Sequence, residues 1–299
     1  MRRLLGIWIS AIFILSSCAG GSTAPSQTSA PVVLASATFL ADIARNIAGD
    51  RVKVESLLPA GADPHSYQPT PQDVTKVVQS SLLIINGAEY EHFLEALLEN
   101  AGGEREVIEA SAGLGPRTNA ESEHGVDPHL WLDPNNVVVY VENIREGLTH
   151  YDPDGAAIYQ SNAESYVAQL KDLDAWINEQ VTQIPPERRL LVTNHEALGY
   201  FADRYDFTVI GAVLPGVSSD ASPSAEQMAK LIDQIQLNDT RALFLDEVEN
   251  PAFAQQIADE TGVKVVEDLH LESLTDGPPA ATYIDMMKHN VTRIVQALK

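Results

Sequence analysis

Short apolar runs alternate with amphipathic stretches along most of the chain from Val32 onward. The apolar runs predict strands, and the stretches between them, with apolar residues three or four positions apart, predict helices. In the first half the strands expected are 32–36, 52–58, 81–87 and 105–111, and the helices are 39–49, a segment from about 72, 90–103 and 134–150. In the second half the strands are 189–194, 207–213, 241–247 and 263–269, with helices near 196–205, 223–237, 251–261 and 281–298. Because strands that alternate with helices form parallel sheets with right-handed crossovers, the pattern predicts an α/β fold of two lobes.

One long amphipathic segment separates the two halves. Between Pro153 and Ile184 apolar residues recur three or four positions apart, so they form a single stripe on one helix, which Pro185 and Pro186 end. The stripe consists of Tyr159, Ala163, Tyr166, Leu170, Leu173, Ile177, Val181 and Ile184. A helix of this length is a rod of roughly 48 Å, and a rigid rod between two lobes restricts hinge motion. Two shorter helices with a break between them are the alternative.

The first residues have the pattern of a secretory signal. A basic start, Met1–Arg3, precedes the apolar run Leu4–Leu15. As a helix this run measures roughly 18 Å, too short for the ~30 Å hydrocarbon core of a bilayer, so it predicts a signal peptide over 1–17 rather than a membrane span. Leu15-Ser16-Ser17-Cys18 resembles the bacterial lipoprotein processing box, in which the cysteine becomes the lipidated first residue. An ordinary signal peptide with a chance cysteine is the alternative.

The following stretch connects the expected lipid anchor to the folded part of the protein. Residues 18–31 lack apolar periodicity and are rich in Gly, Ser, Thr and Pro, which is typical of a flexible tether. We expect an N-terminal lobe over 32–150, a linking helix over 151–186 and a C-terminal lobe over 187–299. The protein would then lie outside the cytoplasm, anchored to the bacterial membrane by lipid, on the cell surface or in the periplasm.

Composition and charge narrow the range of partners. Of the 299 residues, 44% are apolar and 20% are charged, which is typical of a globular protein. The formal net charge of −23 repels phosphate backbones, so no nucleic-acid partner is expected. Cys18 is the only cysteine, which excludes an intrachain disulfide and a cysteine-based zinc site.

Three of the eight histidines stand out by their context. His65 and His129 close the same tripeptide, Asp-Pro-His, in two loops that follow predicted strands, and the proline stiffens each loop. His195 lies at a third strand-to-helix junction. Because ligands bind beyond the carboxyl ends of parallel strands, the three side chains can converge on one cleft between the lobes. Three imidazoles and one carboxylate make a closed tetrahedral metal site; structural histidines are the alternative.

No catalytic motif is found. His195 and Glu196 begin like a zinc-protease helix, but that motif needs a histidine where Gly199 stands. The sequence has neither the Gly-x-Ser-x-Gly elbow of hydrolases nor a Walker-type phosphate loop. We therefore expect a protein that is not an enzyme. The alternatives are a surface adhesin or structural lipoprotein that binds metal incidentally, and an extracellular zinc hydrolase.

Five segments are distinctive when they are taken together. They are 57–73 (LLPAGADPHSYQPTPQD), 126–136 (VDPHLWLDPNN), 193–207 (TNHEALGYFADRYDF), 243–265 (LFLDEVENPAFAQQIADETGVKV) and 282–298 (TYIDMMKHNVTRIVQAL). With them the chain resembles, from about Val33 to Leu298, the zinc- and manganese-binding lipoproteins of bacterial ABC importers, of the cluster A-I type. The resemblance implies two (β/α) lobes joined by one long rigid backbone helix, with a metal site in the cleft between the lobes.

The resemblance also implies the metal ligands. His65 and His129 match the first two, and His195 matches the third, which is His in zinc-type members and usually Glu in manganese-type ones. In the family the fourth ligand, where present, is an Asp that opens an Asp-Ser-Leu-like segment, and here Glu272 stands in that place. Glutamate is chemically competent but one methylene longer. The rivals for this fourth position are Asp268, His270 and a water.

Zn²⁺ is the ion that this ligand set favours. Three imidazoles and one carboxylate form a site of low coordination number suited to Zn²⁺, whereas Mn²⁺, the alternative, prefers more oxygen ligands. The resemblance implies delivery of the ion to an ABC permease in the membrane, and we expect a monomer. Many zinc-type members carry a His-rich loop, which is reduced here to His124 within 117–126. Glu272 is expected to move most on release, because it lies in the Gly- and Pro-bearing stretch 268–281.

Overall fold

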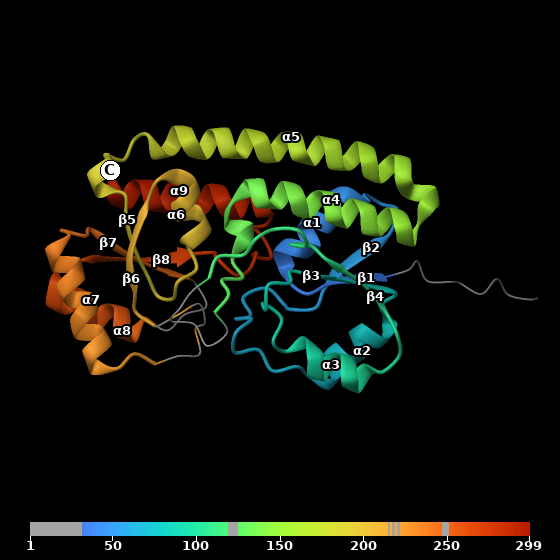
Figure 1. Cartoon of the computed structure of the whole chain (residues 1–299), viewed down its shortest axis with the longest axis horizontal. Helices are drawn as coiled ribbons and strands as arrows, with labels where there is room; N and C mark the ends of the chain where they lie inside the picture. The colour runs from blue at the N-terminus through green and yellow to red at the C-terminus, as the bar shows by residue number, and fades with distance from the viewer. Residues whose placement is uncertain (1–31, 119–124, 215, 217–218, 220–221, 247–250) are drawn as a thin grey trace, which may run out of the picture.

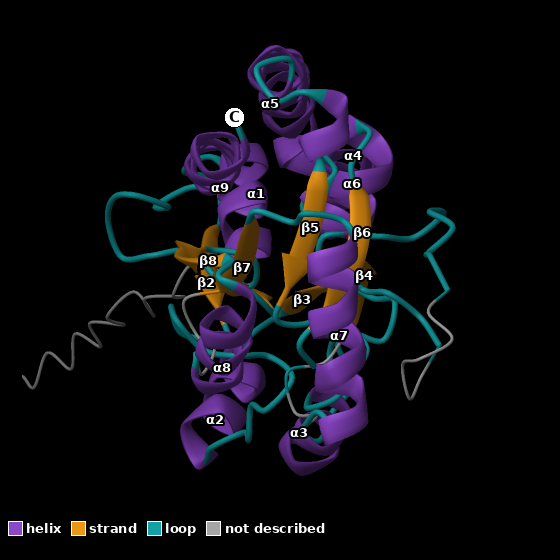
Figure 2. Cartoon of the chain, turned by 90° about the vertical axis from the view of Figure 1, so that its left-hand side faces the viewer, coloured by secondary structure: helices purple, strands orange, loops and turns teal. Residues whose placement is uncertain are grey.

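The computed structural model describes residues 32–118, 125–214, 216, 219, 222–246 and 251–299. These residues form two four-stranded parallel sheets with helices packed on both faces (Figures 1 and 2). The predicted α/β fold with two parallel sheets is confirmed. The expected signal peptide and tether, with Cys18, lie outside the described residues, and so does His124.

The first sheet has the strand order β2-β1-β3-β4. Its strands are β1 (Val32–Ala35), β2 (Lys53–Ser56), β3 (Leu82–Ile85) and β4 (Glu106–Glu109). The helices of this half are α1 (Thr38–Ala48), α2 (Pro71–Gln79), α3 (Leu94–Ala101) and α4 (Pro134–Tyr151), with a 3-10 turn, Leu130–Leu132, before α4. Helix α4 begins where the sequence predicts, because the Asp133 side chain accepts the Asn135 N–H and Pro134 needs no hydrogen-bond partner in the first turn.

The second sheet has the equivalent order β6-β5-β7-β8. Its strands are β5 (Leu190–Thr193), β6 (Thr208–Ala212), β7 (Ala242–Asp246) and β8 (Lys264–Leu269). The helices are α6 (Gly199–Tyr205), α7 (Ala225–Leu237), α8 (Ala252–Thr261) and α9 (Tyr283–Leu298). Strand β7 is buried along its whole length, as expected of a central strand covered by helices on both faces.

The helix expected over 90–103 is shorter than predicted. It begins only at Leu94, after a left-handed turn in which Gly87, Ala88 and Glu89 have positive φ angles. The apolar spacing of this stretch gave no warning of that turn. Tyr90 follows this turn, and its side chain is fully buried next to His65.

The long linking helix is present as predicted. A 3-10 turn, Pro153–Gly155, leads into α5 (Ala156–Val181), and every residue of the predicted apolar stripe is buried. Helix α5 packs on α1 and α4 of the first half and on α9 of the second (Figure 1). One core cluster consequently extends from Val33 in β1 to Phe244 in β7. A shared close-packed core opposes rotation of one sheet against the other.

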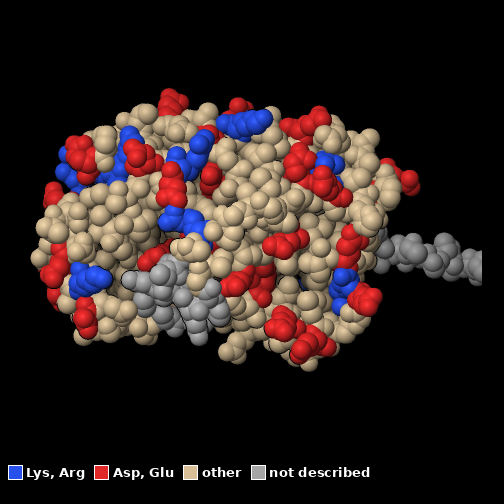
Figure 3. Space-filling model, in the orientation of Figure 1, with Lys and Arg blue, Asp and Glu red and all other residues tan. Residues whose placement is uncertain are grey.

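Helices α1, α4, α5, α6 and α9 lie on one side of the two sheets, and α2, α3, α7 and α8 lie on the other (Figure 2). Acidic side chains outnumber basic ones on the face shown in Figure 3, where the two kinds are interspersed. Among the described residues no helix combines the length and the apolarity that crossing a membrane requires.

Candidate metal centre

The four residues nominated from the sequence meet between the two sheets. His65 lies in the loop after β2, His195 comes directly after β5, and Glu272 follows β8. His129 enters from the loop that precedes α4. Their candidate ligand atoms all lie within 4.8 Å of one another, and each side chain is at most 4% exposed. Loops from both halves of the chain therefore build one buried cluster.

Glu272 is the common neighbour of the three histidines. Its Oε1 lies 2.7 Å from Nε2 of His129, 3.3 Å from Nε2 of His195 and 3.7 Å from Nε2 of His65. Nε2 of His65 and Oε2 of Glu272 are buried and have no hydrogen-bond partner among the residues that the structure describes. Such orphaned atoms are rare in native proteins, and a cation bound by the imidazoles and this carboxylate would satisfy Nε2 of His65. The donor set of imidazole nitrogens and a carboxylate fits a divalent metal ion.

The two protein rivals for the fourth position lie elsewhere. His270 packs against His289, with ring centroids 5.1 Å apart, and is not part of the cluster. Asp268 pairs with Arg293 at 2.8 Å, and its side chain is 53% exposed. The geometry therefore favours Glu272 over either of them.

Both Asp-Pro-His tripeptides form the same local turn. Oδ1 of Asp63 accepts the backbone N–H of His65 at 2.9 Å, and Oδ1 of Asp127 accepts that of His129 at 3.0 Å. Asp127 has a second role, because its Oδ1 also lies 2.8 Å from Nδ1 of His129. A carboxylate that holds one imidazole nitrogen leaves the other directed at the metal. Oδ2 of Asp63 accepts instead from the Ser219 hydroxyl at 2.5 Å, which links the two halves of the chain.

The backbone around Glu272 is firmly held. Oδ2 of Asp246, at the end of β7, accepts the N–H groups of Leu271 and of Glu272, the latter at 3.2 Å. Nε1 of Trp131 donates to the Leu271 carbonyl at 2.9 Å, and the Leu274 N–H donates to the Thr38 hydroxyl at 2.8 Å. These bonds argue against the expectation that Glu272 is the most loosely held ligand. Asp246 is not among the residues nominated from the sequence, although a carboxylate that ends an apolar strand (LFLD) was the available clue.

Electrostatics couple His129 to Glu272. Burial lowers the pKa of His129, but the carboxylates of Glu272 and Asp127 outweigh burial and raise it to about 9. Burial raises the pKa of Glu272, yet its charge interaction and hydrogen bond with His129 hold it well below the ordinary range. In the metal-free protein the two side chains therefore form a buried ion pair at neutral pH. An incoming ion has to displace the proton of His129, so metal binding weakens as the pH falls.

A polar contact ties the His129 loop to α6. The Tyr200 hydroxyl donates to the Asp127 carbonyl at 2.8 Å and accepts the Arg117 N–H at 2.7 Å. The Arg117 guanidinium pairs with Asp127 at 3.7 Å and also with Asp203. A Cβ at Gly199 would lie 2.8 Å from Nε of Arg117, so a larger residue there would displace this guanidinium. These bonds fix a ligand loop of the first half against the second half.

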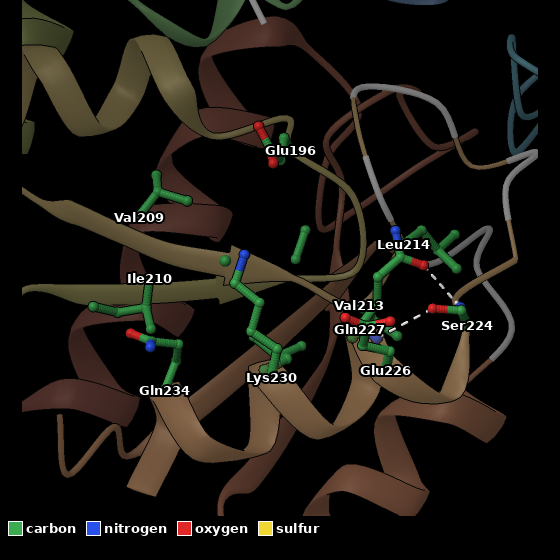
Figure 4. Close-up of a pocket in the computed structure, with 13 residues that line it drawn as sticks. Glu196, Val209, Ile210, Val213, Leu214, Ser224, Glu226, Gln227, Lys230 and Gln234 are labelled. Atoms are coloured by element: carbon green, nitrogen blue, oxygen red, sulfur yellow. Dashed lines mark hydrogen bonds between the residues drawn. The ribbon is translucent and has the colours of Figure 1, made fainter. Parts of the chain in front are cut away.

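A separate cavity of about 730 Å³ lies between β6 and α7 (Figure 4). Its walls include the Val209–Val213 stretch and, on α7, Lys230 and Gln234. Glu196, which follows His195, also lines it, but none of the four clustered residues does. The cavity is therefore distinct from the metal centre.

Comparisons with known proteins agree with the geometry. The chain matches the family described as "Zinc-uptake complex component A periplasmic" over residues 33–297. It is 36% identical over 287 residues to the manganese-binding lipoprotein MntA of Halalkalibacterium halodurans, covering 95% of this chain and 94% of the relative. Among solved structures, the Mn-bound periplasmic metal-binding protein of Candidatus Liberibacter asiaticus superposes with a TM-score of 0.81 at 31% identity, covering 90% of this chain and 100% of the other. The periplasmic zinc-binding protein TroA of Treponema pallidum superposes with a TM-score of 0.83 at 30% identity, covering 90% and 99%.

Proposed function

The chain belongs to the zinc-uptake complex component A family of metal-binding solute-binding proteins of ABC importers, and on that basis we propose that it captures Zn²⁺ and delivers it to a membrane permease. The coarser role, an extracytoplasmic metal-binding component of an importer and not an enzyme, follows from the family. The proposal adds the identity of the ion, its four ligands and the lipid anchor at Cys18.

The observation that carries the choice of Zn²⁺ is the donor set. Three imidazoles and one carboxylate, His65, His129, His195 and Glu272, converge in a buried cluster. Zn²⁺ is commonly four-coordinate with nitrogen and carboxylate donors, whereas Mn²⁺ prefers sites richer in oxygen. The order of affinities for nitrogen-containing sites also places Zn²⁺ above Mn²⁺.

Mn²⁺ is the second candidate, because several relatives are named as manganese-binding lipoproteins. If Mn²⁺ is the cargo, the ion needs more oxygen ligands than a single oxygen of Glu272. The second oxygen of Glu272 or a water molecule would have to provide them. The two candidates therefore differ in coordination number as well as in the ion.

Metal binding by the soluble protein tests the proposal. Metal-free protein comprising residues 25–299 should bind one Zn²⁺ in a chelator competition, and more tightly than it binds Mn²⁺. Loss of a group that only hydrogen-bonds to a metal ligand typically weakens metal binding roughly 10- to 100-fold. Replacing a ligand itself should cost more, so we expect a larger loss of affinity in each of His65→Ala, His129→Ala and His195→Ala. Full affinity in all three variants would place the ion elsewhere, and tighter binding of Mn²⁺ would replace Zn²⁺ with the second candidate.

A further inference from the structure

The ring of Tyr90 lies beside His65 of the metal centre, and its buried hydroxyl group has no hydrogen-bond partner among the described residues. Its ring is fully buried, inclined at 76° to Trp131 with centroids 5.2 Å apart, and it meets the ring of His65 edge-on with centroids 6.4 Å apart. No described residue donates to this hydroxyl or accepts from it. A buried hydroxyl without a partner is destabilising, and such groups are rare in native proteins.

The same centre contains an acceptor that lacks a donor. Oε1 of Glu272 contacts the three imidazoles, but Oε2 has no hydrogen-bond partner among the described residues. Burial raises the pKa of the Tyr90 hydroxyl well above its ordinary value, and the carboxylate of Glu272 adds more to this rise than Glu91 or Asp63 does. Both orphaned groups belong to neighbours of His65, because the Tyr90 ring lies 6.4 Å from the His65 ring and Oε1 of Glu272 lies 3.7 Å from its Nε2.

We propose that Tyr90 determines how Glu272 binds the ion. When Oε1 ligates the metal, the Tyr90 hydroxyl donates to Oε2, and the carboxylate is held as a ligand through one oxygen only. This inference rests on the proposed function, because it concerns the coordination of the captured ion. It assigns Tyr90 as a positioning residue that acts through Glu272 and does not itself touch the metal.

The consequence is a preference between ions. A carboxylate that binds through one oxygen completes a four-coordinate site with the three histidines, as Zn²⁺ favours. A carboxylate free to bind through both oxygens adds a fifth contact and makes the site richer in oxygen, as Mn²⁺ favours. Tyr90 thus favours Zn²⁺ over Mn²⁺ at a centre whose ligands alone would accept both.

Tyr90→Phe tests this inference, because it removes the hydroxyl and keeps the ring between Trp131 and His65. The ratio of Zn²⁺ to Mn²⁺ affinity, measured by chelator competition, should fall about 10-fold, which corresponds to loss of one hydrogen bond to a charged group. Co²⁺ serves as a spectroscopic probe, since its visible absorption is much stronger in four-coordinate than in five-coordinate sites. The Co²⁺ absorption of Tyr90→Phe should therefore be weaker than that of wild type.

Tyr140→Phe is the matched control. Tyr140 is also fully buried, but its hydroxyl donates to Oδ1 of Asn86 at 2.5 Å. In the metal-free protein Tyr140→Phe should lower the melting temperature while leaving the Zn²⁺ to Mn²⁺ ratio unchanged, and Tyr90→Phe should leave the melting temperature unchanged or raise it.

Three results separate the two proposals. An unchanged affinity ratio and an unchanged Co²⁺ spectrum in Tyr90→Phe, with strong Zn²⁺ binding by wild type, would overturn this inference alone. A lower melting temperature of metal-free Tyr90→Phe would also overturn it, because the hydroxyl would then have a partner already. Weak Zn²⁺ binding by wild type would instead overturn the proposed function, together with the preference derived from it.

Discussion

Replacing Asp246 with asparagine should weaken metal binding although Asp246 is not a metal ligand. The carboxylate is buried at the end of β7, and its Oδ2 accepts the backbone N–H groups of Leu271 and Glu272. Through these two bonds the second sheet fixes the segment that presents Glu272 to the three histidines. Asparagine has nearly the same shape, but it is neutral and has one acceptor oxygen instead of two.

The size of the effect follows from those two bonds. A hydrogen bond to a charged group contributes roughly 1.5–3 kcal/mol and a neutral one roughly 0.5–1.5 kcal/mol, so each bond should lose about 1 kcal/mol in Asp246→Asn. The free energy of unfolding of the metal-free protein should therefore fall by about 2 kcal/mol. Metal affinity should fall roughly 10- to 100-fold, as is typical when a group that orients a ligand is changed.

Two assays and one control variant check this reasoning. Urea unfolding of the metal-free protein measures stability without the stabilisation that a bound ion adds, and chelator competition measures the Zn²⁺ affinity. Asp42→Asn is the control, because Oδ2 of Asp42 accepts the backbone N–H of Tyr283 at 2.9 Å, which lies outside the metal centre. The control should keep full Zn²⁺ affinity. If Asp246→Asn loses stability but keeps full Zn²⁺ affinity, Asp246 does not position Glu272.

Two further predictions concern the buried carboxyl group of Glu91 and the expected lipid anchor. Burial raises the pKa of Glu91 from 4.5 to about 7, because the folded protein favours the protonated carboxyl group. The stabilisation of the fold that this preference gives is fully present below pH 4.5 and is lost as the pH rises through 7. In urea titrations of metal-free protein, Glu91→Gln should therefore gain about 3 kcal/mol relative to wild type between pH 5 and pH 8, and an unchanged difference would show that the group is not titrating there. Wild-type protein expressed in bacteria should partition with membranes and Cys18→Ala should not mature normally; mass spectrometry that finds an unmodified Cys18 on the mature protein would contradict the anchor.

The fold could be predicted from the sequence almost completely because its signals are local. The eight strands and most helix boundaries follow from apolar runs, from helical spacing and from prolines and capping residues at the ends. The start of α3 could not be predicted in this way. Residues 90–93 have an apolar spacing compatible with a helix, and only the structure shows that Tyr90 packs in the core directly after the turn through Gly87, Ala88 and Glu89.

The candidate ligands were also accessible from the sequence, for a related reason. His65 and His129 stand in stiff loops after strands, and His195 follows a strand at its junction with a helix, so the topology of a parallel sheet directs all three to one region. The choice of Glu272 over Asp268 and His270 needed the structure. All three lie within a few residues of one another, and only the path of the chain after β8 shows which side chain enters the cluster.

The sequence by itself thus determined the two-sheet architecture, the rigid linking helix and the chemical type of the site, because these depend on periodicity and on the residues at strand ends. The tertiary structure alone decided which groups hold and surround the ligands. Asp246 and Trp131 are distant from Glu272 along the chain, and they come close to it only because helices and strands from both halves pack on one core. Such contacts depend on side-chain packing between elements, which leaves no local pattern in the sequence.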